Sequence, residues 1–127
     1  PFIPRMITEM AHSETGIDIH PGATIGHSFS IDHGTGTVIG ETSVIGNSVR
    51  IFQGVSLAGE KLPPDENGQT IRGVARHPIL EDYVTVYSNS TLIGRTRVGK
   101  GATSCGNVWT AQDVPAGMVI TQNNALR

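Results

Sequence analysis

The sequence predicts an all-β fold, a parallel β-helix that winds in hexapeptides and is triangular in section. Three features indicate this fold: an apolar residue recurs at every sixth position, a small or β-branched residue follows four positions later, and glycine is abundant. The chain has 127 residues, with sixteen Gly but only three Phe, two Tyr and one Trp. This composition fits a single domain with a thin core of small and β-branched side chains.

The six-residue spacing runs through most of the chain. A helical period does not explain it, whereas three short strands per coil, each followed by a tight corner, do. Coils of about 18 residues would point one apolar residue inward on each face. The predicted inward positions are Ile19, Ile25, Ile31, Ile39, Ile45, Ile51, Leu57, Leu80, Val86, Leu92, Val98, Ser104 and Thr110, and their small companions are Ala23, Ser43, Val49, Val55, Val84, Ser90, Thr96, Ala102 and Val108. A β-sandwich is the alternative, but it would need period-two alternation and hairpin turns.

The repeat divides the chain into parts. Residues 1–15 hold apolar residues at helical spacing, which predicts a short N-terminal helix that serves as a packing element: Ile3, Met6, Ile7 and Met10. Residues 16–120 form the β-helix domain, and residues 121–127 form a C-terminal tail. Within the domain, two prolines and the run "DENG" predict that residues 58–77 are an excursion loop off the repeat. Long loops of this kind are often functional.

A smaller interruption lies in "FSIDHGTGTVIG", residues 29–40, where the step from Ile31 to Ile39 is eight instead of six. Without it, Asp18 would have residue 36 as its neighbour in the next coil of about 18 residues, so we expect residues 33–36 to lie over Asp18. The two extra residues would then hold His33 outside the strand and near Asp18. A carboxylate in that position fixes the tautomer of an imidazole and leaves its other nitrogen as a base. A solvated corner histidine is the alternative that the spacing leaves open.

Other residues with metal-binding or charged side chains give weaker signals. Zinc needs three or four ligands at about 2 Å, and His20 and His27 fall on different faces of the predicted prism, so no metal is expected. Arg76 and His77 come just before Pro78, where the loop rejoins the repeat. This pair could clamp a carboxylate or be a solvated part of the loop.

Composition argues against several classes of partner. The formal net charge is −2, with both signs scattered along the chain, which argues against binding to nucleic acid. Cys105 is the only cysteine, so an internal disulfide is impossible, and a reducing compartment, the cytoplasm, is expected. Apolar runs are all too short to span a membrane, and no membrane partner is expected.

Three stretches resemble the catalytic domain of the serine acetyltransferases. They are "TGIDIHPGATIGHSFSIDHGTGTVIGETSVIGNSVRIFQGVSLAG", "RHPILEDYVTVYSNSTLIG" and "VGKGATSCGNVWTAQDVPAG", and the resemblance covers roughly residues 8–120. The combination of "DIHPGA", "IDHGTG", "IGET" and "RHP" at matching spacing is more specific than the hexapeptide repeat alone. The resemblance implies that the β-helix is left-handed. It also implies an enzyme that transfers the acetyl group of acetyl-CoA to the hydroxyl of L-serine, giving O-acetyl-L-serine for cysteine biosynthesis.

The resemblance also implies a role for each candidate residue. His33 matches the general base that takes the proton of the serine hydroxyl, and Asp18 matches the carboxylate that orients it. Asp32 matches the residue that holds the substrate ammonium. Arg76 and His77 match the clamp for the substrate carboxylate. The hydroxyl oxygen would attack the thioester directly, without an acyl-enzyme.

Partners follow from the same resemblance. Acetyl-CoA, a cosubstrate, would lie in a groove between prisms of a homotrimer, with its pantetheine arm against Ala58, Gly59, Ser88 and Asn89. L-cysteine would act as a feedback inhibitor in the serine site. The chain ends in "NNALR" instead of the terminal Ile by which many members bind O-acetylserine sulfhydrylase, so that partnership is the least supported.

Two other functions remain open from the sequence. The first is an acetyltransferase of the same prism whose acceptor is a sugar or another hydroxyl compound, although a sugar would not need the pair Arg76 and His77. The second is a trimeric assembly module that turns over poorly.

Ser104 at an inward position predicts that its coil is less stable than the others.

Overall fold

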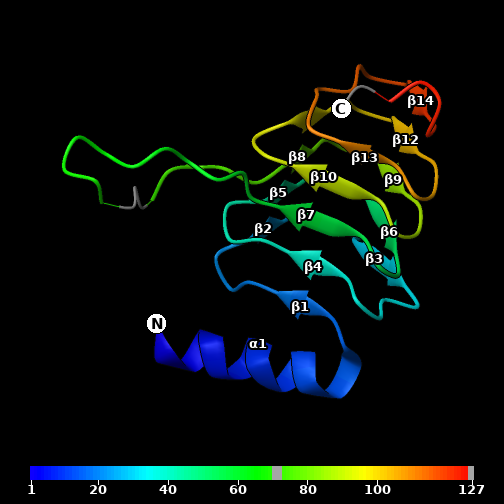
Figure 1. The fold of residues 1–127 in the computed structure, drawn as a ribbon. Coiled ribbons are helices and arrows are strands. Elements are labelled where there is room, and N and C mark those ends of the chain that lie inside the picture. Colours follow the sequence, from blue (N-terminus) through cyan, green and yellow to red (C-terminus); the bar gives the residue numbers. More distant parts are fainter. Residues whose placement is uncertain (70–72, 126–127) are drawn as a thin grey trace.

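A computed structural model describes residues 1–69 and 73–125 of the chain (Figure 1). One helix, α1 (Phe2–Thr15), is followed by short strands only. Parts of the predicted excursion loop, residues 58–77, and of the predicted tail, residues 121–127, fall outside the described residues.

The strands form three parallel sheets that stack as a solenoid (Figure 1). The first sheet has the order β1-β4-β7-β10-β13, the second β11-β8-β5-β2, and the third β14-β12-β9-β6-β3. The strands are β1 (Asp18–Ile19), β2 (Thr24–Ile25), β3 (Ser30–Asp32), β4 (Val38–Ile39), β5 (Val44–Ile45), β6 (Arg50–Phe52), β7 (Ser56–Ala58), β8 (Ile79–Leu80), β9 (Thr85–Val86), β10 (Thr91–Ile93), β11 (Arg97–Val98), β12 (Thr103–Ser104), β13 (Trp109–Thr110) and β14 (Val119–Ile120). Consecutive strands always belong to different sheets, which is the topology of the predicted β-helix, and the predicted fold class is therefore confirmed.

The predicted inward positions all lie in strands, and they make the core together with their companions. From Ile39 to Thr110 the inward side chains are at most 2% exposed. The companions from Ser43 onward are also buried. In the first coil, by contrast, Ile19, Ile25 and Ile31 are only partly buried. Of the described residues, only helix α1 lies beyond this end of the prism (Figure 1).

Within the predicted domain, residues 16–120, the inward positions continue beyond Thr110, the last one predicted. Val114 forms an isolated parallel bridge with Val98, and Ile120 in β14 pairs with Ser104. Both side chains are 5% exposed and belong to the core. The step from Thr110 to Val114 is four residues instead of six, so a search for a constant period ends at Thr110.

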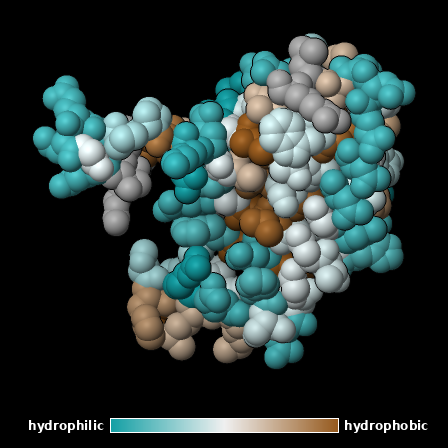
Figure 2. Space-filling model, viewed as in Figure 1, coloured by the Kyte–Doolittle hydropathy of each residue, from teal (hydrophilic) through white to brown (hydrophobic). Residues whose placement is uncertain are grey.

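Helix α1 ends where Gly16 takes a left-handed conformation (φ 75°) and its N–H donates to the carbonyl of His12 at 2.8 Å. This is the usual helix end at a glycine. The helix lies beneath β1, and its apolar side chains, expected to pack, remain exposed in the single chain (lower left of Figure 2). They are Phe2, Ile3, Met6, Ile7 and Met10.

The excursion loop leaves the prism after β7, returns at β8 and projects away from the strands, as predicted (Figure 1). In its described part the Asp65 carboxylate accepts the N–H groups of Asn67 and Gln69, at 2.9 and 2.8 Å. At its root, the N–H of Glu60 donates to the carbonyl of Arg76. Within the described residues, α1 is the only helix, and it is too short and too polar to cross a membrane.

Candidate functional site

The insertion between β3 and β4 consists of two residues at one corner of the prism. Asp32 pairs with Phe52 and Val38 pairs with Ser56, so five residues stand between these positions in the first coil and only three in the next. Since the N–H of Gly54 donates to the carbonyl of Thr35, residues 35–37 follow the regular path. The extra residues are therefore His33 and Gly34.

Backbone conformation carries this corner outward. His33 has φ 64° and Gly34 has φ 90°, both in the left-handed region. The N–H of Gly34 donates to the carbonyl of Asp32 at 2.8 Å, which closes a tight turn. A Cβ at position 34 would collide with Ile17, so only glycine fits the turn. The His33 side chain is left 74% exposed.

The imidazole of His33 lies beside the carboxylate of Asp32. His33 Nε2 is 3.7 Å from Asp32 Oδ1, which is too long for a hydrogen bond but close enough for an ion pair when the ring is protonated. Both groups face solvent, since the Asp32 side chain is 51% exposed. The corner thus presents an imidazole and a carboxylate to any molecule that approaches it.

Asp18 does not lie beneath residues 33–36, where the sequence predicted it. It pairs with Val38, and the corner packs instead over Gly16 and Ile17, with the N–H of Gly36 donating to the carbonyl of Gly16. The expectation that residues 33–36 lie over Asp18 was therefore wrong, because the insertion shifts the register by two. An orienting contact from Asp18 to His33 stays a prediction.

Asp18 is instead grouped with two residues of α1. One ligand atom each of Glu9, His12 and Asp18 lie within 4.8 Å of one another. A glutamate and a histidine three positions apart on a helix, with a third carboxylate, could hold a divalent metal after small movements. Sequence reasoning missed this group, although the spacing of Glu9 and His12 was a visible signal.

His77 is a buried residue with a defined hydrogen-bonding environment, and its ring depends on Thr42. It is 6% exposed. Its Nδ1 accepts the N–H of Thr42 at 3.1 Å and lies 2.7 Å from the Thr42 hydroxyl. That hydroxyl oxygen also accepts the N–H groups of Arg76 and His77, at 2.9 and 3.0 Å. The hydroxyl proton is therefore free to point at Nδ1.

These contacts fix the tautomer of the neutral His77 ring. Because Nδ1 accepts a backbone N–H, the proton of the neutral ring is on Nε2. Burial lowers the pKa of His77, and the positive charge of Arg76 lowers it further, while Glu41 acts in the opposite direction. A neutral ring with a donor on Nε2 can bind a carboxylate without gaining a proton.

Glycines make room for the clamp pair. A Cβ at Gly40 would overlap the His77 ring, and a Cβ at Gly59 would overlap the guanidinium of Arg76. Arg76 Nη1 donates to the carbonyl of Glu60 at 3.2 Å. Gly59, predicted to contact acetyl-CoA, thus also lines the Arg76–His77 pair.

The predicted site residues gather at two different corners of one chain. One corner joins the third sheet to the first, between β3 and β4 and between β9 and β10; the other joins the first sheet to the second, after β7 and before β8. In a single chain these residues therefore form two separate groups. One lies where the strands of the first sheet begin and the other where they end, and we call these two sides the opposite edges of the first sheet. The first group is Asp32, His33, Ser88 and Asn89, and the second is Ala58, Gly59, Arg76 and His77.

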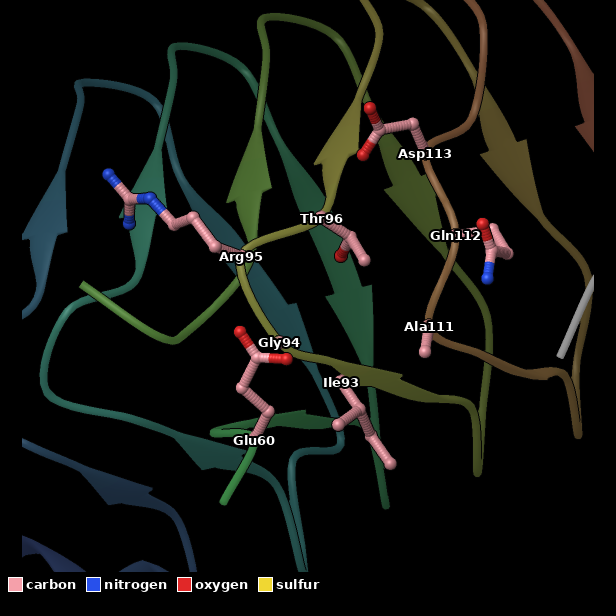
Figure 3. A pocket seen from close by; sticks show the side chains of 8 residues that line it. All are labelled: Glu60, Ile93, Gly94, Arg95, Thr96, Ala111, Gln112 and Asp113. Atoms are coloured by element: carbon pink, nitrogen blue, oxygen red, sulfur yellow. The ribbon is translucent and has the colours of Figure 1, made fainter. Parts of the chain in front are cut away.

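A cavity of about 370 Å³ adjoins the second group (Figure 3). Its lining includes Glu60, Gly94, Arg95, Thr96, Gln112 and Asp113. Ala58 lies next to this lining, since its carbonyl accepts the N–H of Gly94 at 3.0 Å. Arg95 points away from the cavity in Figure 3, because its Nη1 donates to the carbonyls of Thr42 and His77. Sequence reasoning missed the cavity residues, which come from three coils.

Comparisons with known proteins agree with this architecture. No protein-family model matches the chain. The chain is 58% identical to "Serine acetyltransferase, plasmid" of Synechococcus elongatus over 122 residues, which is 96% of this chain and 38% of that protein. Its structure superposes with a TM-score of 0.86 on serine acetyltransferase 1 of Entamoeba histolytica in complex with L-cysteine, at 41% identity, over 94% of this chain and 44% of that one.

A third relative is soybean serine acetyltransferase complexed with serine. It has a TM-score of 0.82 and 33% identity, over 94% of this chain and 46% of the soybean chain. The chain thus spans less than half the length of each of these three proteins. Along nearly its whole length, the chain is similar in sequence and in structure to serine acetyltransferases.

Proposed function

We propose that this chain carries the acetyl-transfer chemistry of a serine acetyltransferase, with acetyl-CoA as donor and L-serine as acceptor. The observation that carries the proposal is the 58% identity to a serine acetyltransferase, together with relatives whose structures hold L-cysteine or serine. The products are O-acetyl-L-serine and CoA. Serine and cysteine share the ammonium and carboxylate groups, so L-cysteine is also proposed as an inhibitor in the acceptor site.

His33 is proposed as the general base. It takes the proton of the serine hydroxyl while the oxygen attacks the thioester carbonyl; the C–O bond forms, the C–S bond breaks, and the proton passes to the departing CoA sulfur. Its exposed corner position supports this role, because the ring can reach a bound acceptor. Asp18 is proposed to orient the ring. Such a base contributes about 10²–10⁴-fold to a rate.

Different residues are proposed to bind the two charged groups of the acceptor, its ammonium and its carboxylate. Asp32, beside His33, is proposed to hold the ammonium group. Arg76 and the Nε2–H of His77 are proposed to hold the carboxylate, in line with the neutral tautomer set by Thr42. These two groups occupy opposite edges of the first sheet, so one acceptor can contact both only if they come from neighbouring chains.

A homotrimer would meet this requirement. If the first sheet of each of three prisms faced a threefold axis, one edge of each sheet would adjoin the opposite edge of the next. The outward side chains of β4, β7, β10 and β13 are uncharged, and pale and brown atoms spread over this face in Figure 2. They are Val38, Ser56, Ala58, Thr91, Ile93 and Trp109, while Asp18 of β1 begins the same row.

Acetyl-CoA is proposed to lie along the same junction between prisms. Ala58 and Gly59 of one chain, and Ser88 and Asn89 of its neighbour, would contact the pantetheine arm, and the cavity of Figure 3 would extend this surface. No metal takes part in the proposed reaction. The cytoplasm remains the proposed compartment, and binding to O-acetylserine sulfhydrylase remains the least supported partnership.

Thiol release from acetyl-CoA, with L-serine as acceptor, tests the proposal. The assay is run beside His33→Ala and a panel of sugars, with the mass in solution measured by light scattering. Release that depends on L-serine and is lost in a trimeric His33→Ala supports it. Release with sugars alone would favour another hydroxyl acceptor. A trimer without release on any acceptor would favour an assembly module.

A further inference from the structure

An aromatic pair stands directly beside Asp32 on the outer face of the third sheet. Asp32 of β3 pairs with Phe52 of β6 in the parallel register. Tyr87, the residue directly after β9, continues this row, since Ile51 pairs with Val86 immediately before the two aromatic residues. Residues in one such row are about 4.8 Å apart along the prism axis, and their side chains point to the same side.

Tyr87 stacks on the ring of Phe52. The ring centroids of Phe52 and Tyr87 are 4.8 Å apart with an interplanar angle of 23°, so the rings are stacked. Since β6 lies between β3 and β9, Tyr87 covers the face of Phe52 that is turned away from Asp32. The register places Asp32 in the row on the side of Phe52 that is opposite to Tyr87. The side chain of Tyr87 is itself 43% exposed.

We propose that Phe52 is a specificity-determining residue: the ammonium group of the acceptor, held by Asp32, lies against the free face of the Phe52 ring. This inference rests on the proposed function and deepens it. A carboxylate and an aromatic face together favour a cation, because the ring quadrupole attracts positive charge and its apolar surface removes competing water. Tyr87 is a positioning residue that holds the ring through stacking.

This arrangement explains how an exposed carboxylate can select an amino acid. A single exposed ion pair is weak, since water competes for both partners. A hydroxyl group can also bond to Asp32, but it gains nothing from the face of Phe52. The ring should therefore affect acceptors that carry an ammonium group and leave others unaffected.

Fluorinated phenylalanines at position 52 provide the test, because fluorine withdraws charge from the ring face while the ring shape is kept. The apparent KM for L-serine is measured with mono-, di- and trifluorophenylalanine, beside 3-hydroxypropanoate, which lacks only the ammonium group. We expect the KM for L-serine to rise with each fluorine, by about 3- to 10-fold in total, with kcat little changed. The KM for 3-hydroxypropanoate should not change.

Controls separate this inference from general packing and from the proposed function. Tyr83→Leu removes an aromatic residue that is 60% exposed at a different corner, and it should leave both KM values unchanged. Tyr87→Leu should raise the KM for L-serine less than Phe52→Leu does. In binding measurements, Phe52→Leu should weaken L-cysteine binding in wild type but have no further effect in Asp32→Asn. Serine turnover with no dependence on fluorination would overturn this inference alone, whereas no turnover on any acceptor would overturn the proposed function.

Discussion

The hydroxyl of Thr42 lies 2.7 Å from Nδ1 of His77 and accepts the backbone N–H groups of Arg76 and His77. The Thr42 side chain thus ties the end of the excursion loop to the prism, beside the buried ring whose tautomer is set by the backbone N–H of Thr42. Thr42 and His77 occupy equivalent positions of adjacent coils, since Val44 pairs with Ile79. The loop inserts its extra residues between these positions without disturbing the stacking.

Thr42→Val should therefore destabilise the fold and loosen the loop root. The substitution keeps the shape of the side chain but leaves two N–H groups without their acceptor, which should cost about 2 kcal/mol in the free energy of unfolding. Chemical denaturation measures this loss, and hydrogen exchange should show reduced protection of the amides of Arg76 and His77. Thr42→Ser keeps the hydroxyl and should stay within about 0.5 kcal/mol of wild type. Equal stability of all three proteins would contradict the role assigned to Thr42.

Stability should depend on pH through His77. Burial, and then Arg76, hold its pKa in the folded chain below its ordinary value. Between that lowered pKa and about 6.5, the unfolded chain binds more protons than the folded chain, so the free energy of unfolding rises with pH in this window. Acidification from about pH 7 to 5 should destabilise the protein by an amount that His77→Gln partly removes. The two proteins share every other ionisable group, so the difference between their stability curves isolates His77. Parallel stability curves would show that His77 is not the group responsible.

Much of the fold could be predicted because the core follows one period. Each coil adds one inward residue per face, and this rule depends only on neighbours along the chain. The rule fails where the chain changes its step. After Thr110 the step is two residues shorter, so the constant period did not identify Val114 and Ile120 as inward residues. After Ile31 the step is two residues longer, so Asp18 pairs with Val38 instead of residue 36.

The candidate site could be predicted in part, for a related reason. Asp32 and His33 are neighbours in sequence, and their placement follows from the insertion. Thr42 is separated from His77 by 35 positions, and the loop conceals their common register. The stacking of Phe52 on Tyr87 also crosses this loop, so no local pattern shows it.

Deleting His33 and Gly34 together should leave the prism intact and abolish acetyl transfer. The deletion restores the six-residue step, so Asp32 would lead into Thr35 along the path that the next coil takes through Gln53. We expect the melting temperature to change by only a few degrees, because the His33 side chain is exposed and Gly34 contributes no side chain to the core. Circular dichroism and light scattering follow the fold and assembly, and thiol release follows activity. An unfolded deletion variant would show that the corner is structural, and an active one would remove His33 from the mechanism.

Ser104→Val should stabilise the protein. Ser104 is 2% exposed at an inward position, in a row whose other inward residues include Val86 and Ile120. Its hydroxyl lies 3.1 Å from the carbonyl of Cys105, which also accepts the Ser90 hydroxyl at 2.9 Å. Valine would therefore leave that carbonyl bonded and add apolar contact with its neighbours, a gain of about 1 kcal/mol. Urea denaturation measures it, with Ser104→Ala as a matched control that adds no comparable side chain. A valine variant less stable than wild type would mean that the coil is too narrow here, and that serine is required for packing.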